Sequence, residues 1–264
     1  MVFGFFKKDK GNANAQPTVN ASASSSNATV STLNLSKEEA VKTLNLRKET
    51  LGITLEKKAL KNVHARVAIV MDQSGSMSNL YKNGTVQAVI ERILPIGLQF
   101  DDNGELDIWL FSDKFKRLDS ITENDFYQYV NREIMNKREN QIWGGTRYAP
   151  VMQDVLTKYV SEEPSTIPTF VIFVTDGENF DHSQSESVIR EASNHNIFWQ
   201  FVGIGDEDFK FLKKLDDLKG RKIDNANFFQ IENINKISDE ELYNLLLNEY
   251  PVWEKEARQI GLIQ

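Results

Sequence analysis

The 264-residue sequence contains no cysteine. This absence excludes disulfide bonds, thiolate metal ligands and a cysteine nucleophile, and it is more natural in a reducing compartment. No apolar run approaches the roughly 20 residues that a membrane-spanning helix needs. The net charge of −7 argues against a sequence-independent grip on the phosphates of nucleic acid. We therefore expect a cytoplasmic protein with no integral membrane segment and no nucleic acid partner.

The beginning of the chain has little that could fold. In MVFGFFKKDK the apolar part is too short for a signal-peptide core, and the lysines follow it instead of preceding it. We expect a flexible start, with a docking peptide or a weak membrane contact as the alternative. From Asn12 to Leu35 there is no charged residue, and Asn, Ala, Ser and Thr dominate. We interpret residues 1–31 as a disordered tail and linker.

Residues 32–62 are interpreted as an adapter segment. Ser36 and Glu39 match a capping box, so we predict a helix from about Ser36 to Glu49. In the following GITLEKK, apolar and polar residues alternate as in a strand, which predicts an extended piece after the helix. The strings TLNLSKE and TLNLRKE echo one another, but two copies are too few for a solenoid.

After Asn62 short apolar runs alternate with helical patterns. We predict strands at 65–71, 105–112, within 166–179, at 197–205 and at 225–232, with 114–118 as a hairpin partner of the second. We predict helices at 79–99, 122–136, 151–160, 183–193, 208–218 and 238–262, the first kinked or ended by Pro95 and the last broken before Pro251. This alternation predicts an α/β fold, a doubly wound and mostly parallel sheet with helices on both faces.

The predicted domain covers residues 63–235, and residues 236–264 form a C-terminal helical extension packed on it. Leu242, Leu245, Leu246, Tyr250 and Trp253 recur there at helical spacing. We expect this apolar face to pack on the domain, with a partner-docking helix as the alternative. In a doubly wound sheet ligands bind beyond the carboxyl ends of the strands, so the strand ends are the place to look for a site.

Three loops at predicted strand ends carry oxygen-bearing side chains. DQSGS supplies Asp72, Ser74 and Ser76, GGT supplies Thr146, and TDG supplies Asp176. Each loop alone has an ordinary explanation as a helix cap or a turn. Together, two carboxylates and three hydroxyls make a hard oxygen environment that suits Mg²⁺. Their order, strand context and spacing favour a metal site.

These five residues resemble the complete metal-ion-dependent adhesion site of von Willebrand factor A domains. That family has D-x-S-x-S after the first strand, a threonine in a later loop and an aspartate after the fourth strand. Further strings, among them IWGGTRYAPVM, FVIFVTDGENFD and FWQFVGIG, are similar to bacterial A-domain proteins of the tellurium-resistance and stress-response group. The resemblance implies the same doubly wound fold.

The resemblance also implies a mechanism. Ser74, Ser76 and Thr146 would ligate the ion directly, and Asp72 and Asp176 would act partly through water. The ion, Mg²⁺ or alternatively Mn²⁺ or Ca²⁺, would then accept a carboxylate from a protein partner. We expect an interaction module in stress-response assemblies, not an enzyme. Candidate residues for the surrounding rim are Trp143, Arg147, Tyr148 and Asn179.

Two other functions remain as alternatives. Asp72 after a first strand also suits a metal-dependent phosphatase or hydrolase with an aspartyl nucleophile, although the acid/base carboxylate expected two residues later is replaced by Ser74. The second alternative is nucleotide binding. The string VGIGDEDF at 202–209 places glycines after a strand, but the full glycine spacing of a dinucleotide-binding motif is absent.

The chain has only three histidines. We expect His64, His182 and His195 to be surface or capping residues and not metal ligands. His182 lies closest in sequence to the Asp176 loop. Asp181, in the same stretch, is a candidate to hold the ligand-bearing loops in place without binding the metal itself.

Overall fold

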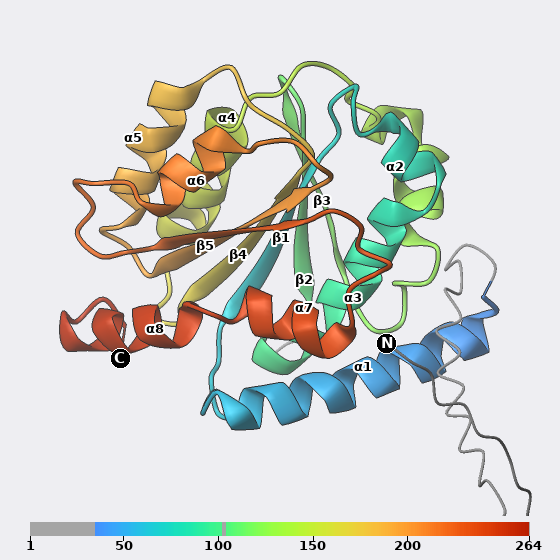
Figure 1. Ribbon diagram of the computed structural model, residues 1–264, viewed down its shortest axis with the longest axis horizontal. Coiled ribbons are helices and arrows are strands. Elements are labelled where there is room, and N and C mark those ends of the chain that lie inside the picture. The colour runs from blue at the N-terminus through green and yellow to red at the C-terminus, as the bar shows by residue number, and fades with distance from the viewer. Residues whose placement is uncertain (1–34, 102–103, 264) are drawn as a thin grey trace, which may run out of the picture.

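The computed structural model describes residues 35–101 and 104–263, and the predicted tail at 1–31 lies outside them. Its centre is a six-stranded sheet in the order β3-β2-β1-β4-β5-β6 (Figure 1). The strands are β1 (Arg66–Asp72), β2 (Leu106–Phe111), β3 (Phe115–Ile121), β4 (Thr169–Thr175), β5 (Ile197–Ile204) and β6 (Ala226–Ile231). Neighbours pair in parallel except β3, which pairs antiparallel with β2. The predicted doubly wound, mostly parallel sheet is confirmed.

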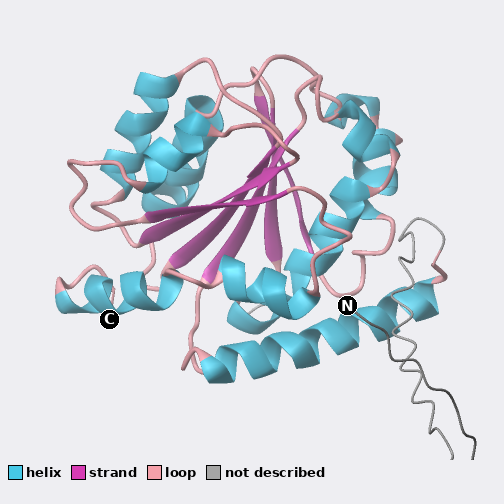
Figure 2. Cartoon of the chain, viewed as in Figure 1, coloured by secondary structure: helices cyan, strands magenta, loops and turns pink. Residues whose placement is uncertain are grey.

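Helices cover both faces of this sheet (Figure 2). The α-helices are α1 (Lys37–Lys57), α2 (Ser78–Lys82), α3 (Thr85–Phe100), α4 (Ala149–Leu156), α5 (His182–Ala192), α6 (Lys210–Asp216), α7 (Asp239–Leu246) and α8 (Tyr250–Gln259). Shorter helical turns are η2 (Val130–Met135), η3 (Arg138–Asn140) and η4 (Thr157–Glu162). Across the described residues, none of these helices combines the length and the apolarity needed to cross a membrane.

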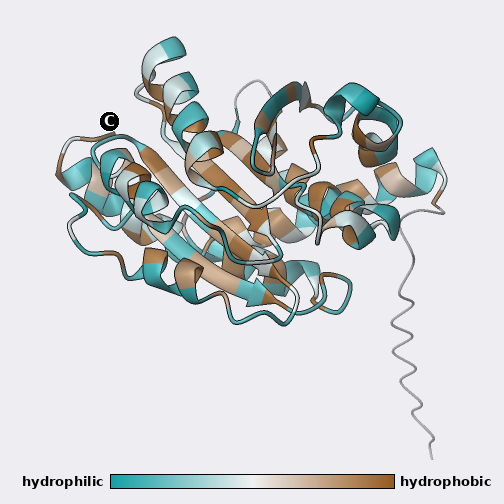
Figure 3. Ribbon diagram, turned by 90° about the horizontal axis from the view of Figure 1, so that it is seen from above, coloured by the Kyte–Doolittle hydropathy of each residue, from teal (hydrophilic) through white to brown (hydrophobic). Residues whose placement is uncertain are grey.

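Strand β1 is buried on both faces, which explains its continuous apolar sequence. Val67 and Ile69 belong to the core under α1, α3, α7 and α8, whereas Ala68 and Val70 belong to the core under α4, α5 and α6. Much of the sheet is accordingly brown, the colour of hydrophobic residues, in Figure 3, whereas the edge strand β3 has the more polar sequence FKRLDSI. A one-residue slip would exchange these two faces, so burial fixes the register and holds Asp72 at the carboxyl edge of the sheet.

The prediction of an extended piece after residue 49 is wrong. Helix α1 continues to Lys57, and Leu51 and Leu55 on its buried face join the core beneath α3 and α7. Burial of this face outweighs the preference of the β-branched Ile53 and Thr54 for a strand. The predicted start of the helix is confirmed, because the capping box of Ser36 and Glu39 is present.

The predicted helix over 79–99 breaks at a different place from the one expected. It is divided at Gly84, whose φ of 84° is left-handed, and the second part, α3, runs through Pro95. Glycine adopts this conformation without the clash of a β-carbon, so the chain turns there.

The prediction of a helix over 122–136 is wrong for its first half. Turns lie there instead, Gln128 has a left-handed φ of 52°, and the helical part is the π-helix η2. The backbone N–H of Val130 donates to the side chain of the buried Gln87 at 2.8 Å. A side chain from α3 therefore replaces the helical partner that the sequence pattern suggested.

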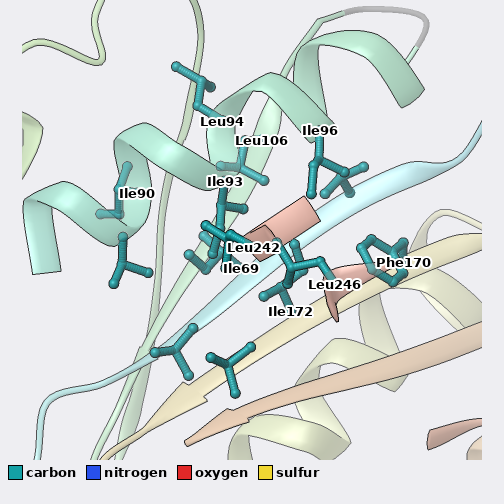
Figure 4. Packing of buried hydrophobic residues seen from close by; sticks show 14 of the residues in the cluster. Ile69, Ile90, Ile93, Leu94, Ile96, Leu106, Phe170, Ile172, Leu242 and Leu246 are labelled. Atoms are coloured by element: carbon teal, nitrogen blue, oxygen red, sulfur yellow. The ribbon is translucent and has the colours of Figure 1, made fainter. Parts of the chain in front are cut away.

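The two C-terminal helices pack on the sheet. Leu242 and Leu246 of α7 lie over Ile69 and Ile172 of the sheet (Figure 4). The rings of Tyr250 and Trp253 from α8 stand 5.7 and 5.4 Å from that of Phe198 in β5. The break between the helices precedes Pro251, as predicted. The apolar face of this segment is thus covered by its own domain.

The helical state of GITLEKK can be tested at Gly52. No heavy atom lies within 4 Å of the position that a β-carbon would occupy there. We predict that Gly52→Ala raises the free energy of unfolding by about 0.5–1 kcal/mol, because alanine loses less conformational entropy in a helix. Urea denaturation followed by circular dichroism measures the change.

Gly203→Ala is the matched control, because its β-carbon would lie 2.8 Å from the Phe209 ring in the core and should lower stability. An unchanged or lower stability for Gly52→Ala would contradict a helix at this position.

Candidate metal centre

Asp72 ends strand β1 and is fully buried. Its Oδ1 accepts a hydrogen bond from the backbone N–H of Ser74 at 2.6 Å, and its Oδ2 accepts one from the Thr175 hydroxyl at 2.6 Å. Burial disfavours the charged form and raises the pKa of Asp72 to about 7, although these hydrogen bonds oppose the shift. A cation beside this carboxylate would favour its charged form.

The side chains of Ser74, Ser76 and Asp176 converge above Asp72. The two serine hydroxyl oxygens lie 3.0 Å apart, and the Ser76 hydroxyl donates to Asp176 Oδ1 at 2.8 Å. Asp176 follows β4, the neighbour of β1 in the sheet, so parallel pairing delivers both loops to one edge. Burial is the main cause that raises the pKa of Asp176 above its ordinary value. The structure therefore brings together four of the five predicted ligands.

The fifth predicted ligand, Thr146, lies in a loop that the backbone ties to both others. The Gly75 N–H donates to the Gly144 carbonyl at 3.0 Å, beside a parallel bridge between Ser74 and Gly144. The Phe180 N–H donates to the Thr146 carbonyl at 3.1 Å. These contacts hold Thr146 between the Ser76 loop and the Asp176 loop.

Two of the oxygen separations are compatible with a small octahedral cation. Ligands about 2.0–2.1 Å from Mg²⁺ stand about 2.9 Å apart along an octahedral edge. The separations of 3.0 Å from Ser74 to Ser76 and 2.8 Å from Ser76 to Asp176 are close to that edge, and they are also the lengths of the hydrogen bonds that these groups make with one another. Within residues 35–101 and 104–263 no three His, Cys, Asp or Glu side chains are grouped to hold a metal ion. A metal here would depend on hydroxyl oxygens, which suit Mg²⁺, Mn²⁺ or Ca²⁺ better than softer ions.

A family model described as "vWA found in TerF C terminus" matches residues 64–263. The chain belongs to this A-domain family. The chain is 52% identical over 212 residues to the protein YcbR of Bacillus subtilis (strain 168), an alignment that covers 80% of this chain and 86% of YcbR. The resemblance to the A domains of the tellurium-resistance group is thereby confirmed at the level of the family.

Solved structures agree with this assignment. The fold is similar to the SpRpn10 VWA domain, with a TM-score of 0.53 and 12% identity over 70% of this chain and 95% of that one. It is also similar to a von Willebrand factor type A protein from Catenulispora acidiphila, with a TM-score of 0.50 and 16% identity over 69% of this chain and 41% of that one. At such identities the likeness shows the fold of the A domain alone.

Two of the four predicted rim residues are wrong, because their side chains are buried. Tyr148 is fully buried, stands edge-on against the Phe111 ring and donates its hydroxyl to the Gly177 carbonyl at 2.5 Å. Asn179 is 4% exposed, and its amide donates to Asp181 Oδ1 at 2.7 Å. Both side chains hydrogen-bond to the loop that follows Asp176 from its buried side, so they are not available for contact with a partner.

Trp143 and Arg147 are the rim candidates that reach the surface. Trp143 is half-buried, and its ring stands edge-on to that of Tyr81 at 5.1 Å. The side chain of Arg147 is 49% exposed, and its Nε lies 4.0 Å from Asp181 Oδ2. Their contact with a partner stays a prediction.

Asp181 joins two of the site's loops. Its carboxylate accepts the backbone N–H groups of Tyr148 at 3.0 Å and Ala149 at 2.9 Å, at the start of α4. It also follows the Asp176 loop directly in the chain. This geometry is consistent with the supporting role predicted for Asp181.

The histidines lie apart from the converging oxygens. The His182 ring stacks on Phe211 with centroids 4.0 Å apart, and its Nε2 is 3.5 Å from Glu178 Oε2. His195 Nε2 is 3.4 Å from Glu191 Oε1, and His64 is exposed ahead of β1.

Sequence reasoning missed Gln73, which lies between Asp72 and Ser74. Gln73 is fully buried, and its Oε1 accepts the backbone N–H of Ile142 at 2.6 Å. The hydroxyl of Ser112, just past β2, donates to the carbonyl of the same Ile142. The loop that carries Thr146 is therefore held from both sides at Ile142. Gln73 occupies the first x of the D-x-S-x-S motif, a position that the motif leaves open, so the motif did not indicate this contact.

We predict that Gln73→Leu lowers the affinity of the A domain for Mg²⁺ about tenfold, because it releases the Thr146 loop without removing a ligand. Isothermal titration calorimetry measures the affinity. Gln200→Leu is the matched control: Gln200 is also fully buried, but it bonds Asn227 of β6 at 3.1 Å. Equal affinities for the two variants would contradict the positioning role of Gln73.

Proposed function

We propose that this A domain is a Mg²⁺-dependent interaction module that binds an acidic side chain of a protein partner through the metal. A domains of this family typically mediate protein interactions, which supports the coarser part of the proposal. The observation that carries the finer part is the convergence of the Ser74, Ser76 and Asp176 oxygens, within hydrogen-bond distance of one another, at the carboxyl edge of the sheet. Mn²⁺ or Ca²⁺ could replace Mg²⁺ in the same oxygen set.

The donor set explains why a bound ion would attract a further anion. Ser74, Ser76 and Thr146 would supply uncharged oxygens, and only Asp72 and Asp176 would supply charge. When bound, the ion supplies a positive centre that a carboxylate can approach. Ser76 is exposed, so the approach is from the solvent side of the loops. The partner's carboxylate would complete the coordination.

The family supports a role in cytoplasmic tellurium-resistance or stress-response assemblies. The chain has no cysteine, so it has no thiol that could reduce or trap a tellurium oxyanion. We therefore assign it an indirect role, in which it gathers other proteins.

A hydrolase that uses Asp72 as its nucleophile is the less favoured candidate. Both carboxylate oxygens of Asp72 accept hydrogen bonds, from Ser74 and from Thr175, and the side chain is fully buried. Neither oxygen is presented to a substrate. Turnover of p-nitrophenyl phosphate that disappears in Asp72→Asn would favour the hydrolase instead.

The metal is tested directly by thermal unfolding. Mg²⁺ at ten times its Kd should raise the Tm of the wild-type chain by about 3–5 °C, because only the folded state binds it. Ser76→Ala removes one ligand, so the rise should disappear or shrink strongly. Ser78→Ala, two residues further on at the start of α2, is the control and should keep the full rise.

The same variants test partner binding. Proteins retained by the immobilised wild-type chain in Mg²⁺ should elute with EDTA and should not be retained by Ser76→Ala. Retention that neither EDTA nor Ser76→Ala changes would contradict the proposed function.

A further inference from the structure

Phe180 is the most exposed of the large hydrophobic side chains in the described part of the chain. It is 83% exposed, whereas Leu46, the next, is 63% exposed. It lies four residues after Asp176, in the same loop as that predicted ligand. A single exposed apolar residue is ordinary on a surface, so its local setting decides whether it means anything.

The backbone at Phe180 is held on both sides. The preceding Asn179 and the following Asp181 are each 4% exposed, and Asn179 donates to Asp181 and to Ser185. The N–H of Phe180 itself donates to the Thr146 carbonyl at 3.1 Å. The Phe180 ring thus faces solvent from a segment held by hydrogen bonds, whereas the side chains of Asn179 and Asp181 on either side of it are buried.

The ring also lies against the glycine pair of the Thr146 loop. A β-carbon on Gly145 would stand 3.6 Å from Phe180 Cε2, an ordinary van der Waals contact. Gly145 is exposed and carries no side chain, so a peptide backbone can approach closely there. At Gly144 the Asp113 carboxylate occupies the place that a β-carbon would take. One exposed glycine with an aromatic ring beside it therefore borders the candidate metal centre.

The charges around the centre limit which acidic partner fits. Glu178 is exposed two residues after Asp176, and Glu207 adds a further negative charge near Asp176. Arg147 is a positive group at this edge, but its Nε already lies 4.0 Å from Asp181 Oδ2. A run of acidic residues would be repelled by Glu178 and Glu207. A segment with one acidic residue and apolar neighbours would avoid that repulsion.

We propose that Phe180 determines partner specificity: the partner presents a segment in which one acidic residue enters the metal centre and an adjacent or next-but-one large apolar side chain packs on the Phe180 ring. This inference rests on the proposed function. The Phe180 ring gains nothing from the hydrophobic effect until such a side chain covers it. Gly145, which has no side chain, leaves room for the backbone of that segment beside the ring.

Peptide selection tests the proposal without a known partner. The full chain is immobilised, a random peptide library is selected in Mg²⁺, and bound peptides are eluted with EDTA. We expect the eluted peptides to share a single Asp or Glu with Leu, Ile, Met or Phe beside it or one residue further. One selected peptide then serves as the probe for affinity measurements.

Phe180→Ser should weaken binding of this probe about tenfold, as loss of an aromatic contact residue does, and should leave the Mg²⁺-induced rise in Tm unchanged. Phe180→Leu should keep most of the affinity, because it keeps an apolar contact. Leu46→Ser is the matched control, because Leu46 is an exposed apolar residue on α1, on the other side of the sheet from α4 to α6. It should leave both readouts unchanged.

The outcomes separate the two proposals. Acidic peptides selected without an apolar preference, or equal probe affinities for Phe180→Ser and wild type, would overturn the role of Phe180 and leave the proposed function standing. Failure to select any peptide that needs Mg²⁺ would overturn the proposed function and the specificity role with it.

Discussion

The candidate centre depends on one buried carboxylate. Asp72 is fully buried, and its two oxygens accept hydrogen bonds from Ser74 of its own loop and from Thr175 of the neighbouring strand. These bonds join the carboxyl ends of β1 and β4 and so fix the relative position of the two loops that follow. The register between Met71 and Val174 extends this alignment through the sheet. The serine and aspartate oxygens above Asp72 meet because the strands below them cannot slide.

A second set of polar contacts fixes the Thr146 loop against the loops that follow β1 and β4. Gln73 accepts the backbone N–H of Ile142, Ser112 donates to the carbonyl of Ile142, and Asp181 accepts backbone N–H groups at the start of α4. None of these side chains is a predicted ligand. Each is buried, and breaking any of these hydrogen bonds would leave a buried polar group without a partner, which is costly. The loops that carry the candidate ligands are therefore held in place by buried hydrogen bonds beneath them and need no contacts on their solvent side.

The sequence predicted the fold and the meeting of the Asp72, Ser76 and Asp176 loops because both depend on local patterns; that these side chains bind a metal stays a prediction. Buried parallel strands read as apolar runs, and a parallel sheet collects their following loops at one edge. It failed where burial is decided by distant packing. Tyr148 and Asn179 are polar loop residues, and only the folded loops turn them inward. Phe180 stands between two buried polar residues, and no periodicity indicates that its ring is the one that faces outward.

Helix α1 carries a consequence for how this protein is divided. The similarity to the family begins at residue 64, yet Leu44, Leu51 and Leu55, which precede it, complete the same core as α3 and α7. A chain cut at the family boundary would leave that core uncovered on one side and would be prone to aggregate. The unit that folds is therefore longer than the segment that the family model matches, and α1 is part of its hydrophobic core.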